Sequence, residues 1–290
     1  MFSKWRCLGS LALLLLVGLA LILPLWYLHG RPAPLPVRQT VRRGVEYRRI
    51  VRLTPRPMII HVLTIDMRTN GLNFLVTPPD DLGSDLPLRG RTTSQFLEQF
   101  NLDIAVNGDG CRPWWSRSPL DYYPKEGDLV APRGRAASRG RVYWRTDLPT
   151  PTLYISSRNR LSFDAPAQPY NAISGEERLL INGSIVENLN ATDVHPRTAV
   201  GYSKNGRYLY LVVVDGRQPL YSEGITLHEL AELMLSLGAY DAMNLDGGGS
   251  STMVIRDADG RPRVLNSPID QYIPGRERVV CNHLGIYFRR

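Results

Sequence analysis

Short segments of alternating or continuous apolar character recur along the chain, which is the pattern typical of β-strands. Residues 45–53 and 58–66 alternate loosely, whereas residues 102–106 and 209–214 are almost entirely apolar, as strands buried on both faces are. Further strands are predicted at residues 72–77, 178–181, 184–186, 198–203, 240–245, 251–255 and 284–288. The Asn-Gly pairs at 182–183 and 205–206 have the composition of two-residue hairpin turns.

One segment shows clear helical spacing. Thr226 and Glu229 form a Thr-x-x-Glu capping box, in which each side chain binds the backbone N–H of the other residue. The apolar positions that follow fall at i, i+3, i+4 and i+7: Leu227, Leu230, Ala231 and Met234. Gly238 stands where a glycine would end this helix, and a second, shorter helix is predicted after Thr92.

Because strands outnumber helices, the predicted fold is α+β (mixed α/β), with a mostly antiparallel or mixed sheet and a few packed helices. A single globular domain is expected over residues 58–290, and a chain of 290 residues can bury a sizeable core. Residues 31–57 are predicted to be an Arg/Pro-rich linker that includes the first strand. Residues 1–30 are predicted to be an N-terminal signal-anchor or transmembrane segment.

The predicted membrane segment is an uncharged run of 22 residues, 7–28, which is long enough to span a bilayer. Lys4 and Arg6 precede it, and Trp26 and Tyr27 lie at its far end, where interfacial aromatic side chains are found. The residues after it match a signal-peptidase site poorly, which favours a single-pass anchor over a cleaved signal peptide. The domain is then expected outside the cytoplasm, in the periplasm, on the cell surface or in a lumen.

The basic charge of the chain is concentrated near this segment. Residues 1–60 contain ten Lys/Arg and one acidic residue, a net charge of +9, whereas the whole chain carries +8, so residues 61–290 carry −1. A nearly neutral domain offers no basic face for nucleic acid. The Arg-rich stretch 31–56 is expected to be a solvated linker, and contact with anionic lipid headgroups is the alternative.

The cysteine content fits an oxidising compartment. Cys7 lies in the apolar run, which leaves Cys111 and Cys281 in the domain. Two cysteines outside the cytosol often pair, which predicts a Cys111–Cys281 disulfide, and two buried free thiols are the alternative.

Residues 111–148 show little apolar periodicity and are predicted to form a long functional loop. Its aromatic side chains are Trp114, Trp115, Tyr122, Tyr123, Tyr143 and Trp144. Aromatic faces beside Arg and Asp suit sugar rings, and packing of the loop onto the core is the alternative explanation.

Polar residues follow predicted strands in several Gly-rich turns, of which the most informative is 244–252, Asn-Leu-Asp-Gly-Gly-Gly-Ser-Ser-Thr. Three consecutive glycines indicate a sharp turn or a close approach to the backbone. Exposed N–H groups and hydroxyls there would suit phosphate or sugar oxygens, and a glycine-rich hairpin without chemistry is the alternative. Asn107 with Asp109, and Asp215 with Arg217, occupy comparable turns.

The order and spacing of these motifs resemble the phosphodiester glycosidase family. The matching stretches are His195-Pro-Arg-Thr-Ala-Val-Gly201, Val212-Val-Val-Asp-Gly-Arg217, Ser222-Glu-Gly-Ile-Thr-Leu-His-Glu-Leu230 and Gly238-Ala-Tyr-Asp-Ala-Met-Asn-Leu-Asp-Gly-Gly-Gly-Ser-Ser-Thr252, with Asn107-Gly108, Arg278-Val-Val280 and Asn282-His283. The resemblance covers about residues 58–290, from which residues 111–148 depart as an insertion. It implies a hydrolase that cleaves a GlcNAc-1-phosphate-type diester in a glycan or an envelope exopolysaccharide.

The resemblance also implies roles for individual residues. Asp246, Glu223 and Asp215 are the candidate catalytic carboxylates, and Arg197 is the candidate bidentate phosphate clamp. The other expected substrate-binding residues are Asn107, Asp109, Gly247, Gly248, Gly249, Ser250, Ser251 and His283. The motifs specify no cofactor, although the oxygen atoms of Asn107, Asp109, Asp215 and Asp246 would suit Ca²⁺ or another divalent cation. A non-catalytic envelope module that binds a glycan or an anionic polymer is the alternative function.

Overall fold

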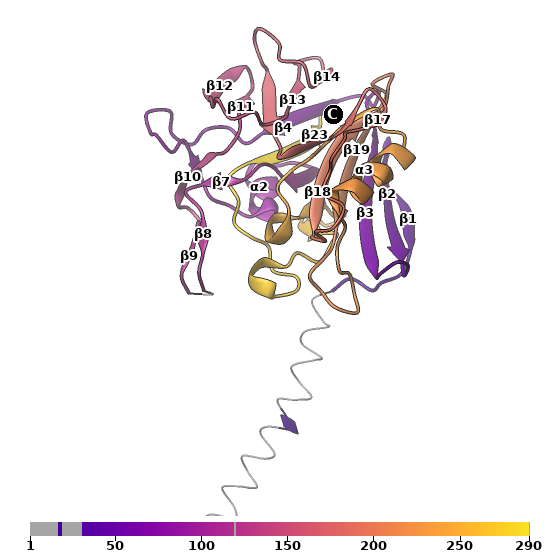
Figure 1. Cartoon of the computed structure of the whole chain (residues 1–290). Coiled ribbons are helices and arrows are strands. Elements are labelled where there is room, and N and C mark those ends of the chain that lie inside the picture. The colour runs from indigo at the N-terminus through magenta and orange to yellow at the C-terminus, as the bar shows by residue number, and fades with distance from the viewer. Residues whose placement is uncertain (1–16, 19–30, 119, 290) are drawn as a thin grey trace, which may run out of the picture.

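The structure is a computed structural model that describes residues 17–18, 31–118 and 120–289 (Figure 1). The predicted membrane segment at 7–28 lies outside this part of the chain except for residues 17 and 18. In the described residues, no helix has both the length and the apolar character needed to traverse a lipid bilayer.

An eight-stranded antiparallel sheet forms the centre of the domain (Figure 1). Its order is β1 (Val37–Arg42), β2 (Val45–Arg52), β3 (Met58–Asp66), β19 (Tyr208–Val214), β18 (Arg197–Tyr202), β20 (Asp241–Asn244), β16 (Glu177–Ile181) and β17 (Ser184–Ile185). Leu209, Leu211 and Val213 of β19 lie in the core on one face of the sheet, and Val212 and Val214 lie in the core on the other. The almost continuous apolar sequence of β19 therefore reflects burial on both faces.

A second antiparallel sheet packs against one face of the large sheet. Its order is β22 (Pro262–Val264), β21 (Met253–Arg256), β6 (Ile104–Asn107), β23 (His283–Phe288) and β4 (Leu72–Val76). Ile104 of this sheet and Leu211 of the large sheet belong to the same buried cluster. The helix α3 (Leu227–Ser236) covers the other face of the large sheet, and α2 (Thr93–Gln99) covers the second sheet. The order of layers is helix, sheet, sheet, helix.

Both helices begin as predicted. At α3, Thr226 Oγ1 accepts a hydrogen bond from Glu229 N at 3.2 Å, and Glu229 Oε2 accepts one from Thr226 N at 3.0 Å. Gly238 follows with φ of +96°, the left-handed conformation that ends helices. A single domain with mostly antiparallel sheets is confirmed, although the helices within residues 31–118 and 120–289 are two short α-helices and two 3₁₀ turns.

The prediction of a long loop at 111–148 is wrong. This segment contains six short strands: β7 (Cys111–Arg112), β8 (Trp115–Ser116), β9 (Tyr122–Tyr123), β10 (Leu129–Pro132), β11 (Ala136–Ser138) and β12 (Arg141–Trp144). β8 and β9 form a projecting hairpin, and β7 and β10 pair in a small sheet with β5 (Leu88–Arg89). β11 and β12 join β13 (Thr152–Ile155), β14 (Leu161–Ser162) and β15 (Asn171–Ser174). Strands of two to four residues are too short to show an alternating pattern in the sequence.

The Arg-rich stretch predicted as a linker with the first strand contributes the edge strand β1 of the large sheet and its neighbour β2. Val45 and Tyr47 of β2 reach the core. Arginines occupy the more exposed positions, where Arg38 forms a 2.9 Å ion pair with Glu46. The strand predicted at 45–53 is confirmed as β2, whereas β1 was not predicted, because only alternate side chains need to be apolar at the edge of a sheet.

The predicted disulfide between Cys111 and Cys281 is present, with Cα atoms 5.6 Å apart. It joins β7 to the residues directly before β23, across a sequence separation of 170. The disulfide therefore fixes the beginning of the 111–148 insertion to the second sheet.

Candidate active site

The site lies where the ends of the two sheets meet. β20 of the large sheet continues through residues 245–252 into β21 of the second sheet, so the glycine-rich segment is a crossover and not a hairpin. Asn107 holds this crossover in place. Its Nδ2 donates to the Asp246 carbonyl at 2.7 Å, and its Oδ1 accepts from Thr198 Oγ1 at 2.8 Å and Thr252 N at 3.1 Å. Asn107, predicted to bind substrate, is thus committed to holding the chain that carries Asp246.

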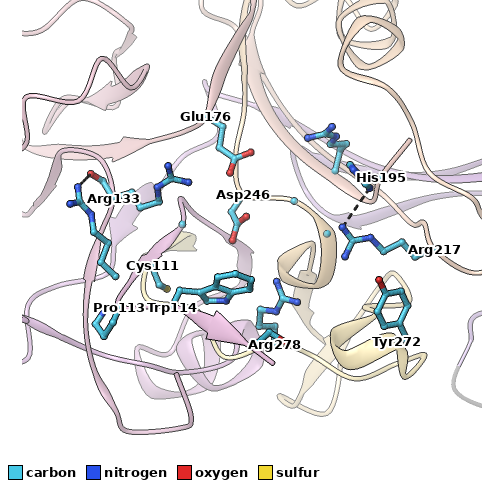
Figure 2. A pocket seen from close by; sticks show the side chains of 16 residues that line it. Cys111, Pro113, Trp114, Arg133, Glu176, His195, Arg217, Asp246, Tyr272 and Arg278 are labelled. Carbon is cyan, nitrogen blue, oxygen red and sulfur yellow. Dashed lines mark hydrogen bonds between the residues drawn. The ribbon is translucent and has the colours of Figure 1, made fainter. Parts of the chain in front are cut away.

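A cavity of about 860 Å³ opens beside the crossover (Figure 2). Its lining contains two carboxylates, Glu176 and Asp246. The arginines of the lining are Arg112, Arg133, Arg197, Arg217 and Arg278. Five guanidinium groups against two carboxyl groups give the cavity the electrostatic character of an anion-binding site.

Glu176 and Asp246 lie next to each other in the cavity, with both carboxyl groups in its interior (Figure 2). Glu176 directly precedes β16, and its Oε2 accepts a hydrogen bond from Asn244 Nδ2 at 3.2 Å. A Cβ atom at Gly175 would overlap the Asn244 carbonyl, so the glycine allows this close approach of two chain segments. Burial, followed by repulsion from Asp246 and Glu177, raises the pKa of Glu176 to about 7.

Burial also raises the pKa of Asp246. Hydrogen bonds from the Ser250 hydroxyl and the Gly247 N–H, together with the positive charge of Arg278, act in the opposite direction because they stabilise the carboxylate. Two carboxyl groups in one buried space do not both ionise readily, so the pair keeps a proton to a higher pH than an exposed carboxyl group would.

The N–H groups of the crossover are mostly engaged within the protein. Gly248 N donates to the Pro196 carbonyl at 2.8 Å, and Ser250 N donates to the Gly247 carbonyl at 3.2 Å. The Gly247 N–H is directed to the Asp246 carboxylate. The three glycines therefore do not provide the predicted cradle of free N–H groups for a phosphate.

The glycines instead make room for guanidinium groups. A Cβ atom at Gly249 would lie 2.5 Å from Arg278 Nη2, and one at Gly248 would lie 3.0 Å from Arg217 Nη1. A side chain at either position would displace the arginine from the crossover. The close approach that the glycine run predicts is thus the approach of two arginines to the backbone beside Asp246.

Arg197 and Arg217 complete the cationic wall. Arg197 begins β18 and is buried, and its Nε has no hydrogen-bond partner among the residues that the structure describes. Arg217 Nη2 lies 3.5 Å from His195 Nδ1. Burial and the charges of these two arginines lower the pKa of His195, so the imidazole is neutral near pH 7. A buried guanidinium with an unused donor is suited to an anionic ligand.

Aromatic side chains stand at the mouth of the cavity. Trp114 and Tyr272 both belong to its lining, and the Arg278 guanidinium lies 5.7 Å from the centre of the Trp114 ring. An exposed ring beside a guanidinium suits the apolar face of a sugar. Trp115 and Tyr123 instead stack on each other with ring centres 4.7 Å apart, as expected of aromatics that pack the insertion itself.

Comparison with known proteins assigns the site to a family. The sequence matches the family model described as phosphodiester glycosidase over residues 100–287, a range that includes both carboxylates and all five arginines of the cavity. The chain belongs to the phosphodiester glycosidase family. The family resemblance of the sequence motifs is thereby confirmed.

Curated relatives match part of their own length. The N-acetylglucosamine-1-phosphodiester alpha-N-acetylglucosaminidases of Bos taurus and Homo sapiens are 32% and 31% identical over 204 residues, which is 63% of this chain and 36% and 37% of theirs. The chain therefore spans little more than a third of the length of these relatives. The uncharacterized SPbeta prophage-derived protein YomE of Bacillus subtilis is 38% identical over 94 residues, 32% of this chain and 13% of its own.

Solved structures share the fold. The catalytic domain of zebrafish N-acetylglucosamine-1-phosphodiester alpha-N-acetylglucosaminidase, auto-inhibited by its pro-peptide, has a TM-score of 0.59 at 22% identity and covers 89% of this chain and 86% of that chain. A hypothetical protein from Synechocystis also has a TM-score of 0.59, at 14% identity, and covers 89% of this chain and 64% of its own. At these identities the likeness shows the phosphodiester glycosidase fold.

Two of the three predicted catalytic carboxylates lie away from the cavity. Asp215 is buried after β19, 3.0 Å from His61 Nε2, and accepts a hydrogen bond from Asn266 Nδ2 at 3.1 Å. Glu223 is exposed and is absent from the cavity lining. Ser251 is buried and likewise does not reach the cavity. Of the predicted catalytic set, the structure brings Asp246 alone to the cavity lining in the described chain.

Asp109 and His283 lie behind the cavity wall. The Asp109 carboxyl accepts hydrogen bonds from Gly134 N at 2.8 Å and Asn282 Nδ2 at 3.1 Å, and burial raises its pKa to about 7. His283 stacks on Phe96 with ring centres 4.5 Å apart, and burial lowers its pKa well below the ordinary value. Neither lines the cavity, so their contacts support the wall from within the fold.

The oxygen atoms considered for a divalent cation do not converge. No group of three or more His, Cys, Asp or Glu side chains that could hold a metal ion occurs within the described residues. Asp215 faces His61, Asp109 binds the backbone of a neighbouring loop, and Asp246 faces the cavity. Asp215 and Asp109 are thus engaged with protein partners, and Asp246 is the one of the three that lines the cavity.

Glu176 and four of the five cavity arginines were not among the site residues predicted from the sequence. Glu176 follows Gly175 beside a strand, which is the same combination of glycine and acid that marked the other turns, so a signal for it was present. Arg112 and Arg133 lie in the insertion, and their positions depend on the disulfide and on strand pairs that have no sequence pattern.

Proposed function

We propose that this protein hydrolyses the glycosidic bond of a sugar-1-phosphodiester. One observation carries the proposal: Glu176 and Asp246 occupy the same cavity as five arginines. Hydrolysis at an anomeric carbon characteristically uses two carboxyl groups. A phosphodiester requires cationic donors, which the arginines supply.

The arginines are assigned to the phosphate. Arg197, Arg217 and Arg278 approach the crossover from different parts of the chain, so they can contact different oxygens of one diester. The leaving group is a phosphate monoester, which is weakly basic. Stabilisation of its charge should therefore contribute more to the rate than strong proton donation does.

The two carboxyl groups are assigned to the sugar and to the leaving group. A charged Asp246 would repel the phosphate, so we place it on the sugar side, where it stabilises positive charge at the anomeric carbon or activates the attacking nucleophile. Glu176, with its pKa raised to about 7, donates its proton toward the departing phosphate oxygen. This pKa is close to the second pKa of a phosphate monoester, roughly 6, so the proton transfer is nearly matched in energy.

The sugar is proposed from the relatives and from the mouth of the cavity. The curated mammalian relatives are named for N-acetylglucosamine-1-phosphodiester, and Trp114 offers a ring against which such a sugar can stack. We propose that the reaction takes place outside the cytoplasm. The apolar run at 7–28 is proposed to anchor the domain to the membrane.

Release of GlcNAc from its methyl 1-phosphodiester tests the proposal. The unmodified protein should release GlcNAc over many turnovers, whereas Asp246→Asn and Glu176→Gln should each lower kcat by about 10²–10⁴. Glu223→Gln is the matched control, because this exposed carboxylate lies outside the cavity and its removal should leave the rate unchanged. Binding of the diester without any release of GlcNAc would support the envelope binding module instead. Full activity of Asp246→Asn would refute the assignment.

A further inference from the structure

The cavity opens near residues 31–36, which precede β1. The Pro32 carbonyl accepts a hydrogen bond from Tyr221 Oη at 3.0 Å, so the start of the domain packs on the loop 215–225 that also carries Arg217. Figure 1 shows the indigo segment before β1 and the β8–β9 hairpin at the same end of the domain. The opening and the residues directly before β1 therefore share one face.

The walls of the opening are tied together on this face. Gln271 Nε2 donates to Ser116 Oγ at 3.0 Å, which joins the 3₁₀ turn η2 (Asp270–Tyr272) to the β8–β9 hairpin. Gln218 Nε2 donates to the Ser267 carbonyl at 2.8 Å, which joins the loop 215–225 to the chain before η2. Ser116, Arg217 and Tyr272 line the cavity, so the three loops that carry them form a connected rim on this side of its opening.

Each of the three rim loops presents an apolar or aromatic side chain to solvent. The hairpin carries Leu120, which is 89% exposed, and Trp114, 51% exposed, precedes it. The loop 215–225 carries Leu220, 97% exposed, and η2 carries Tyr272, 72% exposed. Single exposed apolar residues are ordinary on protein surfaces. A set carried by the loops at one opening indicates a surface that contacts something apolar.

Two of these residues are held in a conformation that favours glycine. Leu220 has φ of +64° and Tyr272 has φ of +60°. A left-handed conformation is unfavourable for residues with a side chain, and glycine would adopt it without strain. Large apolar side chains at both positions indicate that their exposure has a use.

The apolar run in the sequence indicates that a lipid bilayer is the apolar partner of the rim residues. The uncharged run of residues 7–28 is long enough to cross a bilayer, and only residues 29 and 30 separate it from Arg31. A membrane anchor separated from Arg31 by two residues would keep the rim face close to the bilayer. Basic side chains of the hairpin region, Arg117 and Lys125, are exposed beside the aromatic residues, as in proteins that contact headgroups.

We propose that the substrate is a membrane lipid whose headgroup is a sugar-1-phosphodiester, with the headgroup in the cavity and the lipid chain leaving between the rim residues into the bilayer. This inference rests on the proposed function and adds the substrate class. Water forms the new bond to the anomeric carbon, and the bond between that carbon and the phosphate oxygen breaks with its electron pair on the oxygen. The products are the free sugar in solution and a lipid monophosphate that stays in the membrane.

The test compares two diesters of GlcNAc-1-phosphate that differ only in the alcohol. The full chain in phosphatidylcholine nanodiscs is given either the hexadecyl diester, which enters the bilayer, or the water-soluble methyl diester. Confinement of enzyme and substrate to one surface should raise kcat/KM for the hexadecyl diester by about tenfold or more.

Variants of the rim residues test whether the rim guides the lipid chain of the substrate or whether the substrate is only concentrated in the membrane. A double variant, Leu120→Ser with Leu220→Ser, should lower kcat/KM for the hexadecyl diester by about tenfold and leave the methyl diester unchanged, which also shows that the variant folds. Leu82→Ser is the matched control, because Leu82 is 55% exposed on the loop between β4 and β5 and belongs to neither cavity nor rim.

The possible outcomes distinguish the proposed lipid substrate from the proposed hydrolysis of a sugar-1-phosphodiester. Equal rates on the two diesters, or a preference for the hexadecyl diester that the rim variant leaves intact, would overturn the inference while the proposed function stands. Hydrolysis of neither diester would overturn the proposed function and the inference together.

Discussion

Replacement of Asp109 by Asn should make the folded protein less sensitive to rising pH. The Asp109 carboxyl is buried behind the cavity, and its pKa is raised from 3.8 to about 7 because burial disfavours the charged form. The unfolded chain loses this proton near pH 4, whereas the folded chain keeps it until about pH 7. Between these values the folded state binds more protons than the unfolded state, so its stability falls as the pH rises.

The size of the effect follows from the shift. A difference of about 3 pKa units corresponds to about 4 kcal/mol, at about 1.36 kcal/mol for each unit. Asn does not titrate, so the Asp109→Asn variant should lack this loss. Asn retains one of the two hydrogen bonds, from Gly134 N or from Asn282 Nδ2, and the lost bond adds a constant cost of about 1 kcal/mol at every pH.

The assay is urea unfolding of the full chain in detergent micelles, followed by tryptophan fluorescence between about pH 4.5 and pH 8.5. The free energy of unfolding of Asp109→Asn relative to the unmodified protein should rise by about 3–4 kcal/mol across this range. Asp259→Asn is the control, because Asp259 is exposed and its curve should run parallel to that of the unmodified protein. Parallel curves for Asp109→Asn would show that the carboxyl is not buried in the way described.

Three further changes probe the cationic wall and the insertion. Arg197→Lys should lower kcat/KM about 10- to 100-fold, because lysine cannot form the bidentate contact, and an effect below threefold would argue against phosphate at Arg197. Gly249→Ala should lower kcat/KM about tenfold by pushing Arg278 from the crossover, whereas Gly83→Ala, whose added Cβ makes an ordinary 3.5 Å contact, should not. Equal rates for these two alanine variants would show that the arginine does not need the glycine. Reduction of the disulfide should lower the free energy of unfolding by about 2–5 kcal/mol, seen as a lower urea midpoint, and an unchanged midpoint would contradict its constraining role.

Elements fixed by local chemistry were predictable from the sequence. The central strand β19 follows from a continuous apolar run, and α3 follows from its capping box, its apolar spacing and the glycine after its end. Each of these signals lies within about a dozen residues. Hydrogen bonds and burial close in sequence therefore decide such elements before the rest of the chain is considered.

The site depends on contacts between distant segments, which explains what the sequence missed. Glu176 meets Asp246 across 70 positions, because β16 and β20 are neighbours in the large sheet. Glu223 and Asp215 were chosen as acids within matching motifs, but a motif does not specify where a side chain points. The structure directs one to solvent and the other to His61. The arginines of the insertion reach the cavity through strand pairs too short to be recognised in the sequence.

The position of bond cleavage tests the central claim most directly. A glycosidase breaks the bond between the anomeric carbon and oxygen, whereas a phosphodiesterase breaks a bond between phosphorus and oxygen. Hydrolysis of methyl GlcNAc-1-phosphodiester in water enriched in ¹⁸O, followed by mass spectrometry, distinguishes the two. The account predicts methyl phosphate without the label, because the solvent oxygen joins the sugar. Methyl phosphate that carries ¹⁸O would show attack at phosphorus and would contradict the roles given to Asp246 and Glu176.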